Sequence, residues 1–333
     1  MVFSTFIGGS AQDTAQGIAI DLNGNILVAG ATRSPDFPAT PGTISRRGTG
    51  QDGFLATLSA NGSRLLFSAL LGGNHEDGLT GLAIDDHNNI SVSGYTASSD
   101  LPATDHAIRK KVELAEKGGF ENGMDLYLAK VNDSGTALLY LSDIGGGSLL
   151  SSELTWTRPG RLMINGSSNT RSLPLSDRAY SRASKGERDG FISIFDSGSM
   201  TLEYSTLLGG SHFDFVRSAF FLDADRVVLS GETNSPDFPL PGNALYSEYP
   251  VDDKTFNNTF FGKRRFFSHR ATSSSAESGR VRVRFPQRSG PQRRAVRRSA
   301  PERQGGDATW LSRSWERSRQ SRPGQWPAIH RSC

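Results

Sequence analysis

The chain has 333 residues, of which 37 are glycine and 35% are hydrophobic, and this composition fits many short strands better than a helical bundle. Its single cysteine, Cys333, excludes an intrachain disulfide. No stretch approaches the roughly 20 apolar residues that a membrane-spanning helix needs, and residues 1–9 lack the basic and apolar regions of a signal peptide.

The net charge of +3 conceals two opposite parts. From Lys263 onward there are 18 Lys and Arg residues but only 4 Asp and Glu residues, whereas residues 1–262 hold 19 basic and 30 acidic residues. We therefore treat residues 1–262 as an acidic body and residues 263–333 as a basic tail.

The first part of the body contains four short apolar runs separated by turn residues. The runs are GIAI (17–20), NILVAG (25–30), GFLATL (53–58) and RLLFSAL (64–70). DLNG and SANG supply turn chemistry within each pair of runs. The proline phrase SPDFP (34–38) stands between the two hairpins, and because proline lacks an N–H it is best interpreted as a rigid crossover loop.

This pattern of apolar runs and turns occurs four times in the sequence. Each copy starts at an aromatic residue, and these residues are 64, 73 and 64 positions apart: Phe3, Phe67, Tyr140 and Tyr204. The repeat units are residues 3–66, 67–139, 140–203 and 204–261. The longer second unit carries its extra residues at 110–122, which we expect to form a surface loop.

A four-stranded sheet repeated about every 64 residues predicts an all-β fold, namely a β-propeller of about four blades. Two arrangements are open. In a closed four-blade ring, residues 3–7 would pair with residues 256–261 and complete the fourth blade. In a partial arc of a larger propeller, which we favour for the natural protein, further blades would be needed. In this chain we still expect residues 3–7 to seek that free edge.

The repeated motifs resemble a known family. Phe/Tyr-Ser-Thr-x-Leu-Gly-Gly, Gly-Ile-Ala-x-Asp-x-x-Gly-Asn, Gly-x-Thr-x-Ser-x-Asp-Phe-Pro and Asp-x-Phe are similar to the bacterial SBBP β-propeller repeat across residues 3–261. The third unit departs from the pattern at Leu150 and Ser172, where the other units have aspartate. The resemblance implies a bacterial surface or secreted protein located outside the cell or in the envelope. It implies no catalytic residues.

Three aspartates lie ten residues after their aromatic leads, at Asp13, Asp77 and Asp214. Gathered on one face of a ring, they could bind Ca²⁺, which takes several oxygen ligands. We favour the alternative that each caps its own turn through nearby backbone N–H groups. His75 and His212 lie two residues before two of these aspartates and are a further metal candidate. No other cofactor is expected.

A second set of aspartates precedes the third run of each unit, at Asp52, Asp125, Asp189 and Asp253. The apolar residues after the first three, Phe54, Leu126 and Phe191, are expected to be buried between neighbouring sheets. In the third unit the first hairpin has Arg158-Pro159-Gly160 in place of the usual turn, so we expect irregular pairing or higher mobility near residues 147–165.

The motifs of common enzyme classes are missing from the sequence. GTGQDG (48–53) matches a dinucleotide fingerprint, but a strand instead of a helix follows it. We therefore expect a noncatalytic module that binds a protein or a glycan. The alternative is a polysaccharide hydrolase or lyase that uses Asp13, Asp77 and Asp214. The basic tail is expected to be disordered and is typical of a frameshift product; at low salt it would bind nucleic acid without specificity.

Overall fold

The computed structural model describes residues 3–44, 47–48, 50–109, 124–145, 153–157, 160–168, 173–241, 244 and 258–265. All of these lie within one compact unit, residues 1–282, and residues 283–333 form a second unit. The expected loop at 110–122, the substituted positions Leu150 and Ser172, Asp253, and the tail beyond residue 265 lie outside the described residues.

The described part is all-β, as predicted. Its strands form three antiparallel sheets of four strands and one of three, each in sequence order and here called blades 1 to 4. Blade 1 contains β1 (Asp13–Ile20), β2 (Ile26–Thr32), β3 (Asp52–Leu58) and β4 (Leu65–Leu71). Blade 2 contains β5 (Asp77–Ile84), β6 (Ile90–Thr96), β7 (Asp125–Val131) and β8 (Leu138–Gly145). Blade 3 contains β9 (Glu153–Thr157), β10 (Arg161–Ser168), β11 (Asp189–Asp196) and β12 (Leu202–Leu208). Blade 4 contains β13 (Asp214–Asp223), β14 (Arg226–Thr233) and β15 (Asn258–Arg265).

The predicted hairpin turns form for a local reason. The Asp21 carboxylate accepts hydrogen bonds from the backbone N–H groups of Asn23 and Asn25, which closes the turn between β1 and β2. Gly24 takes a φ of 81°, a conformation that suits glycine. In blade 2 Asp85 repeats this arrangement, so the same turn chemistry closes the first hairpins of blades 1 and 2.

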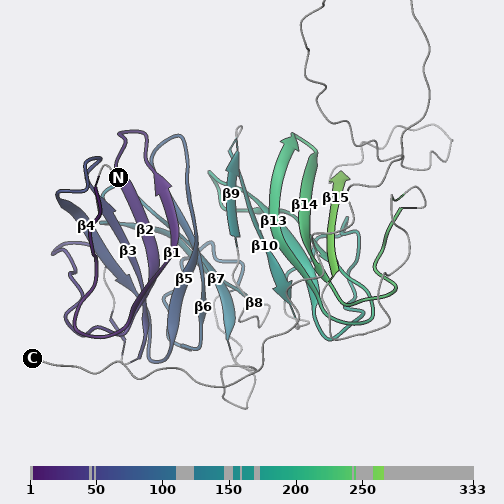
Figure 1. Ribbon diagram of the computed structural model, residues 1–333, viewed down its shortest axis with the longest axis horizontal. Coiled ribbons are helices and arrows are strands. Elements are labelled where there is room, and N and C mark those ends of the chain that lie inside the picture. The colour runs from purple at the N-terminus through teal and green to yellow at the C-terminus, as the bar shows by residue number, and fades with distance from the viewer. Residues whose placement is uncertain are drawn as a thin grey trace, which may run out of the picture. The chain divides into compact units, whose positions relative to one another are not determined.

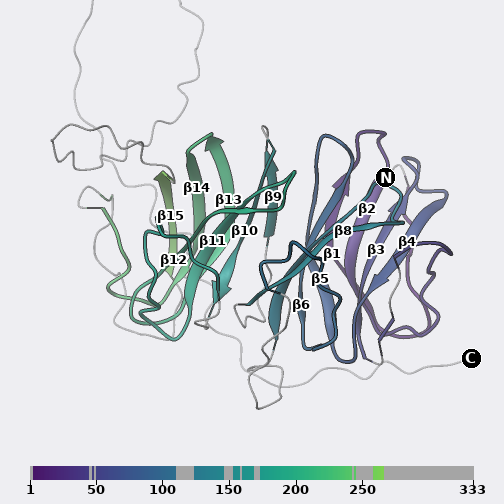
Figure 2. The same ribbon diagram turned by 180° about the vertical axis from the view of Figure 1, so that it is seen from behind.

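Three apolar clusters join the blades in series. One contains side chains of blades 1 and 2, the next side chains of blades 2 and 3, and the third side chains of blades 3 and 4. The alternation of each strand sends successive side chains to opposite faces, so an inner blade contributes to two clusters. Figures 1 and 2 show the same order, with blades 1 and 4 at the two ends of the row.

The residues expected between sheets are all buried, but they differ in location. Leu126 and Phe191 lie in the cluster between blades 2 and 3, as predicted. Phe54 instead lies on the outer face of blade 1, where the proline phrase covers it: the rings of Phe37 and Phe54 are 4.6 Å apart. In blade 4 the repeated phrase also covers a phenylalanine, but within the cluster between blades 3 and 4: the Phe238 and Phe260 rings are 4.4 Å apart.

The expected pairing of residues 3–7 with the free edge of blade 4 is not found among the described residues. Residues 3–7 form no strand, and β15 is paired with β14 alone. Ile7 packs on the outer face of blade 1, and Gly9 and Ser10 are held there by hydrogen bonds to Asp13 and Asp36. Because β15 has no partner other than β14 among the described strands, the four blades form an open arc.

The expectation of irregular pairing in the third unit is also wrong where it can be checked. Residues 153–157 pair with residues 161–165 without a register shift, although β9 has five residues whereas β1 and β5 have eight. Residues 146–152 and 158–159 lie outside the described residues.

Candidate functional site

The antiparallel order gives the arc two rims. The hairpin turns 21–25, 59–64, 85–89 and 197–201 lie on one rim, which we call the hairpin rim. The links between blades and the starts of the crossover loops lie at the opposite ends of the strands, on what we call the junction rim. The two rims carry different chemistry, so their polar residues are considered separately.

The three candidate calcium ligands lie on the junction rim as the first residues of β1, β5 and β13. Each accepts a hydrogen bond from the N–H of the glycine four residues before it: Gly9, Gly73 and Gly210, at 2.7–2.8 Å. Each also accepts one from a crossover serine: Ser34, Ser98 and Ser235, at 2.7–2.9 Å. The structure does not bring the three aspartates together, because each stands in its own blade.

The neighbouring N–H groups of each link are held in the same way. The N–H of the residue after each glycine donates a hydrogen bond to the aspartate of the proline phrase: Asp36, Asp100 or Asp237. The following N–H group donates to the hydroxyl of the same crossover serine, and it belongs to Ala11, His75 or His212. This latch of three consecutive N–H groups explains why the chain repeats Ser-x-Asp-Phe-Pro. The two histidines contribute their backbone to separate latches, and neither belongs to a ligand group among the described residues.

The three aspartates that accept the glycine N–H groups are buried to different degrees, and their pKa values differ accordingly. Burial raises the pKa of Asp77, hydrogen bonds from Thr96, Ser98 and Gly73 oppose this, and the carboxylate of Asp52 in blade 1 adds to the rise, which brings the pKa to about 6. Burial likewise raises the pKa of Asp214, near Asp189 of blade 3. At Asp13 the hydrogen bonds outweigh a smaller burial and hold the pKa below its usual range. A preceding blade is therefore what makes a latch carboxyl hard to ionise.

This difference predicts a pH-dependent stability. Folded Asp77 keeps its proton up to about pH 6, whereas the unfolded carboxyl releases it near its ordinary pKa of 3.8. The stability from this proton is fully present below that lower value and is lost as pH rises through 6, by roughly 2–3 kcal/mol. Asp77→Asn should flatten the fall measured by urea unfolding between pH 4 and 6. An unchanged slope in Asp77→Asn, or equal flattening in the exposed Asp36→Asn, would contradict it.

A cleft lies elsewhere, on the hairpin rim between blades 2 and 3, with a volume of about 1030 Å³. Its walls come from the turns 85–89 and 197–201 and from residues 106–108 of the crossover, which runs beside β8. Asp86, His87, His106 and Asp196 supply polar groups, and Leu139 and Tyr140 supply apolar surface.

A buried ion pair forms part of this cleft. The Lys130 ammonium on β7 lies 2.8 Å from the Asp85 carboxylate, and both side chains are buried. The ammonium also donates to the Ser197 carbonyl of blade 3 at 2.5 Å, which joins the two blades. Burial alone would raise the pKa of Asp85, but hydrogen bonds from Lys130 and Asn89 outweigh it and hold the pKa below its usual value.

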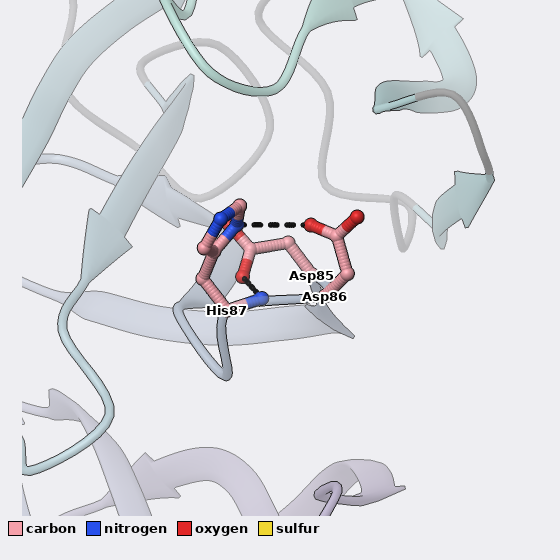
Figure 3. A group of neighbouring side chains, drawn as sticks. All are labelled: Asp85, Asp86 and His87. Carbon is pink, nitrogen blue, oxygen red and sulfur yellow. Dashed lines mark hydrogen bonds and ion pairs between the residues drawn. The ribbon is translucent and has the colours of Figure 1, made fainter.

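Asp85, Asp86 and His87 are the group of described side chains whose potential ligand atoms lie within 4.8 Å of one another. Figure 3 shows His87 turned toward Asp86, with 2.9 Å between its Nδ1 and the carboxylate. Asp85 is committed to Lys130 and to its own turn, so a cation would compete with an ammonium already in place. Sequence reasoning missed this site because DDHNN reads as an ordinary hairpin turn.

The comparisons with known proteins agree with the blades. Residues 2–38 match the SBBP family model, described as a beta-propeller repeat, which confirms the resemblance. No curated protein matches the chain. Among the described residues, no helix has the length and apolar character needed to cross a membrane.

Several solved structures are similar to the chain at low identity. A protein of unknown function from Dyadobacter fermentans is 14% identical, with a TM-score of 0.37, over 68% of this chain and 50% of that one. The phage phi92 endosialidase is 11% identical, with a TM-score of 0.39, over 81% and 38%. An ACO/RPE65 chimera is 11% identical, with a TM-score of 0.35, over 77% and 50%. The chain thus spans half or less of the length of these proteins.

Proposed function

We propose, from the SBBP beta-propeller repeat that residues 2–38 match, that the chain is a noncatalytic binding module of a bacterial surface or secreted protein. The observation that carries this proposal is the engagement of the repeated aspartates. Asp13, Asp77 and Asp214 are each held by a glycine N–H and a serine hydroxyl of their own blade. A glycosidase needs two carboxylates roughly 5–10 Å apart across one sugar, so this arrangement favours a structural role over the hydrolase or lyase alternative.

The ligand we propose is a neutral oligosaccharide bound in the cleft between blades 2 and 3. A concave site of about 1030 Å³ suits a few sugar rings better than the surface of a folded protein. The carboxylates of Asp86 and Asp196 can accept hydrogen bonds from sugar hydroxyls, and the exposed side chain of Leu139 offers apolar surface to a ring. Hydrogen bonds from Ser199 hold the pKa of Asp196 below its usual value, so this negative charge disfavours acidic sugars.

The proposal predicts a specific loss of sugar binding. An oligosaccharide selected on a glycan array should bind Asp86→Ala at least about tenfold more weakly than the original chain, because a hydrogen bond to a charged group contributes about 1.5–3 kcal/mol. Asp177→Ala is the matched control, since this exposed carboxylate pairs with Arg182 outside the cleft. Affinity would be measured by titration calorimetry.

The same samples test the alternative. Release of new reducing ends from a polysaccharide, abolished by Asp77→Asn, would replace the binding role with the hydrolase. Equal affinities of Asp86→Ala and Asp177→Ala would remove the cleft from the proposal.

A further inference from the structure

The two terminal blades expose apolar side chains on the first or second strand of their sheets. On blade 1, Ile18 and Ile20 of β1 are 73% and 69% exposed. On blade 4, Phe220 of β13 and Val228 of β14 are 57% and 39% exposed. These blades stand at opposite ends of the row in Figure 1, so the two patches lie far apart on one molecule.

The strand registers show what these positions do in the inner blades. The first strands of blades 1, 2 and 4 each have a register shift three residues after their aspartate. Counting from this shift aligns Ile18 with Leu82 and Ile20 with Ile84. Leu82 and Ile84 pack into the cluster between blades 1 and 2. The exposed face of blade 1 that carries Ile18 and Ile20 is here called its front. It corresponds to the face of blade 2 that packs against blade 1.

The back of blade 4 is the other half of the same contact. Phe220 pairs with Val228 as Ala83 pairs with Ser91 in blade 2. Ala83 and Ser91 are only 8% and 3% exposed, and Ala83 belongs to the cluster between blades 2 and 3. The exposed face of blade 4 that carries Phe220 and Val228, its back, thus corresponds to the face of blade 2 that packs against blade 3.

The internal contact also shows how the halves fit. Gly17 on the back of β1 lies so close to Leu82 on the front of β5 that a Cβ atom there would be 3.1 Å from the Leu82 Cβ. The position equivalent to Gly17 on blade 4 is Ser218, which is also small. Ile18 can therefore take the place of Leu82 against Ser218.

We propose that the front of blade 1 docks on the back of blade 4 of a second copy of this chain, repeating the contact between successive blades. A second copy is the occupant because one chain carries both halves, and the chain already makes this contact three times within itself. The two patches differ, so the contact is head-to-tail: each copy uses a different face, unlike the shared patch of a twofold dimer.

Complementary variants test this arrangement. Light scattering with size exclusion of the full chain should give a mass at least twice that of one chain at high concentration. Ile18→Glu/Ile20→Glu blocks the front and Phe220→Glu/Val228→Glu blocks the back, so each variant alone should be monomeric. Mixed in equal amounts, they should form a dimer that grows no further, because each retains one competent face. Leu240→Glu, at an exposed apolar residue of the blade 4 crossover loop, should associate like the original chain.

A cross-link identifies the contact independently of the charge variants. In a chain with Cys333→Ser, Ile18→Cys in one copy and Ser218→Cys in the other should form an intermolecular disulfide on mild oxidation, because a close Cβ–Cβ approach permits one. Ile18→Cys should not cross-link with Leu240→Cys. A full chain that stays monomeric, a mixture that fails to dimerise, or equal cross-linking of both pairs would overturn the proposal. None of these outcomes bears on sugar binding in the cleft.

Discussion

Lys130→Met is expected to lower the free energy of unfolding by about 3–5 kcal/mol, because it leaves the buried Asp85 carboxylate without its partner. Methionine keeps the apolar stem of the lysine, so the loss would come mainly from the charge. The substitution also removes the hydrogen bond to the Ser197 carbonyl of blade 3. Guanidinium unfolding of the two proteins at pH 7 measures the difference.

A double variant separates the charge from packing. Asp85→Asn removes the charge while its side-chain oxygen can still accept the turn N–H groups of His87 and Asn89. Lys130→Met/Asp85→Asn should therefore recover much of the stability that Lys130→Met loses. The exposed pair Arg182–Asp177 is the control, and Arg182→Met should cost less than about 1 kcal/mol. Equal costs for Lys130→Met and Arg182→Met would show that the ion pair contributes no more than a surface one.

Much of the architecture could be predicted from the sequence because its determinants are local. Asp21 and Gly24 close one hairpin within five residues, and Asp85 gives the same kind of signal in the second unit. The proline phrases were recognisable as crossover loops for the same reason. The capping role favoured for Asp13, Asp77 and Asp214 agrees with the bonds that they make, since their glycine donors lie only four residues away.

The features that could not be predicted depend on which blades become neighbours. Lys130 reads as one polar residue in an apolar strand, and only the fold places it against Asp85 and Ser197. Residues 3–7 carry the pattern of a fourth strand, yet they form no strand, and Ile7 packs on the outer face of blade 1. Phe54 and Phe191 follow equivalent aspartates, but one faces a loop and the other faces a blade. The repeated motif thus predicts the structure within a blade well, but it does not predict which contacts the blade makes with its neighbours.

That difference between two phenylalanines leads to the second large effect. Phe191→Ala should lower the free energy of unfolding by about 3–5 kcal/mol, because a fully buried ring would be replaced by a cavity between two sheets that cannot close together. Phe54→Ala should cost less, since the proline phrase that carries Phe37 is a loop and can move into the space.

Phe6→Ala is the control for both substitutions, because that ring is fully exposed and its removal should change stability by less than about 0.5 kcal/mol. Denaturant unfolding of the three variants should rank the losses as Phe191, then Phe54, then Phe6. A loss at Phe54 equal to or greater than that at Phe191 would mean that the outer face of blade 1 is packed as rigidly as the contact between blades 2 and 3. A loss at Phe191 no larger than that at Phe6 would mean that blades 2 and 3 do not pack through this ring at all.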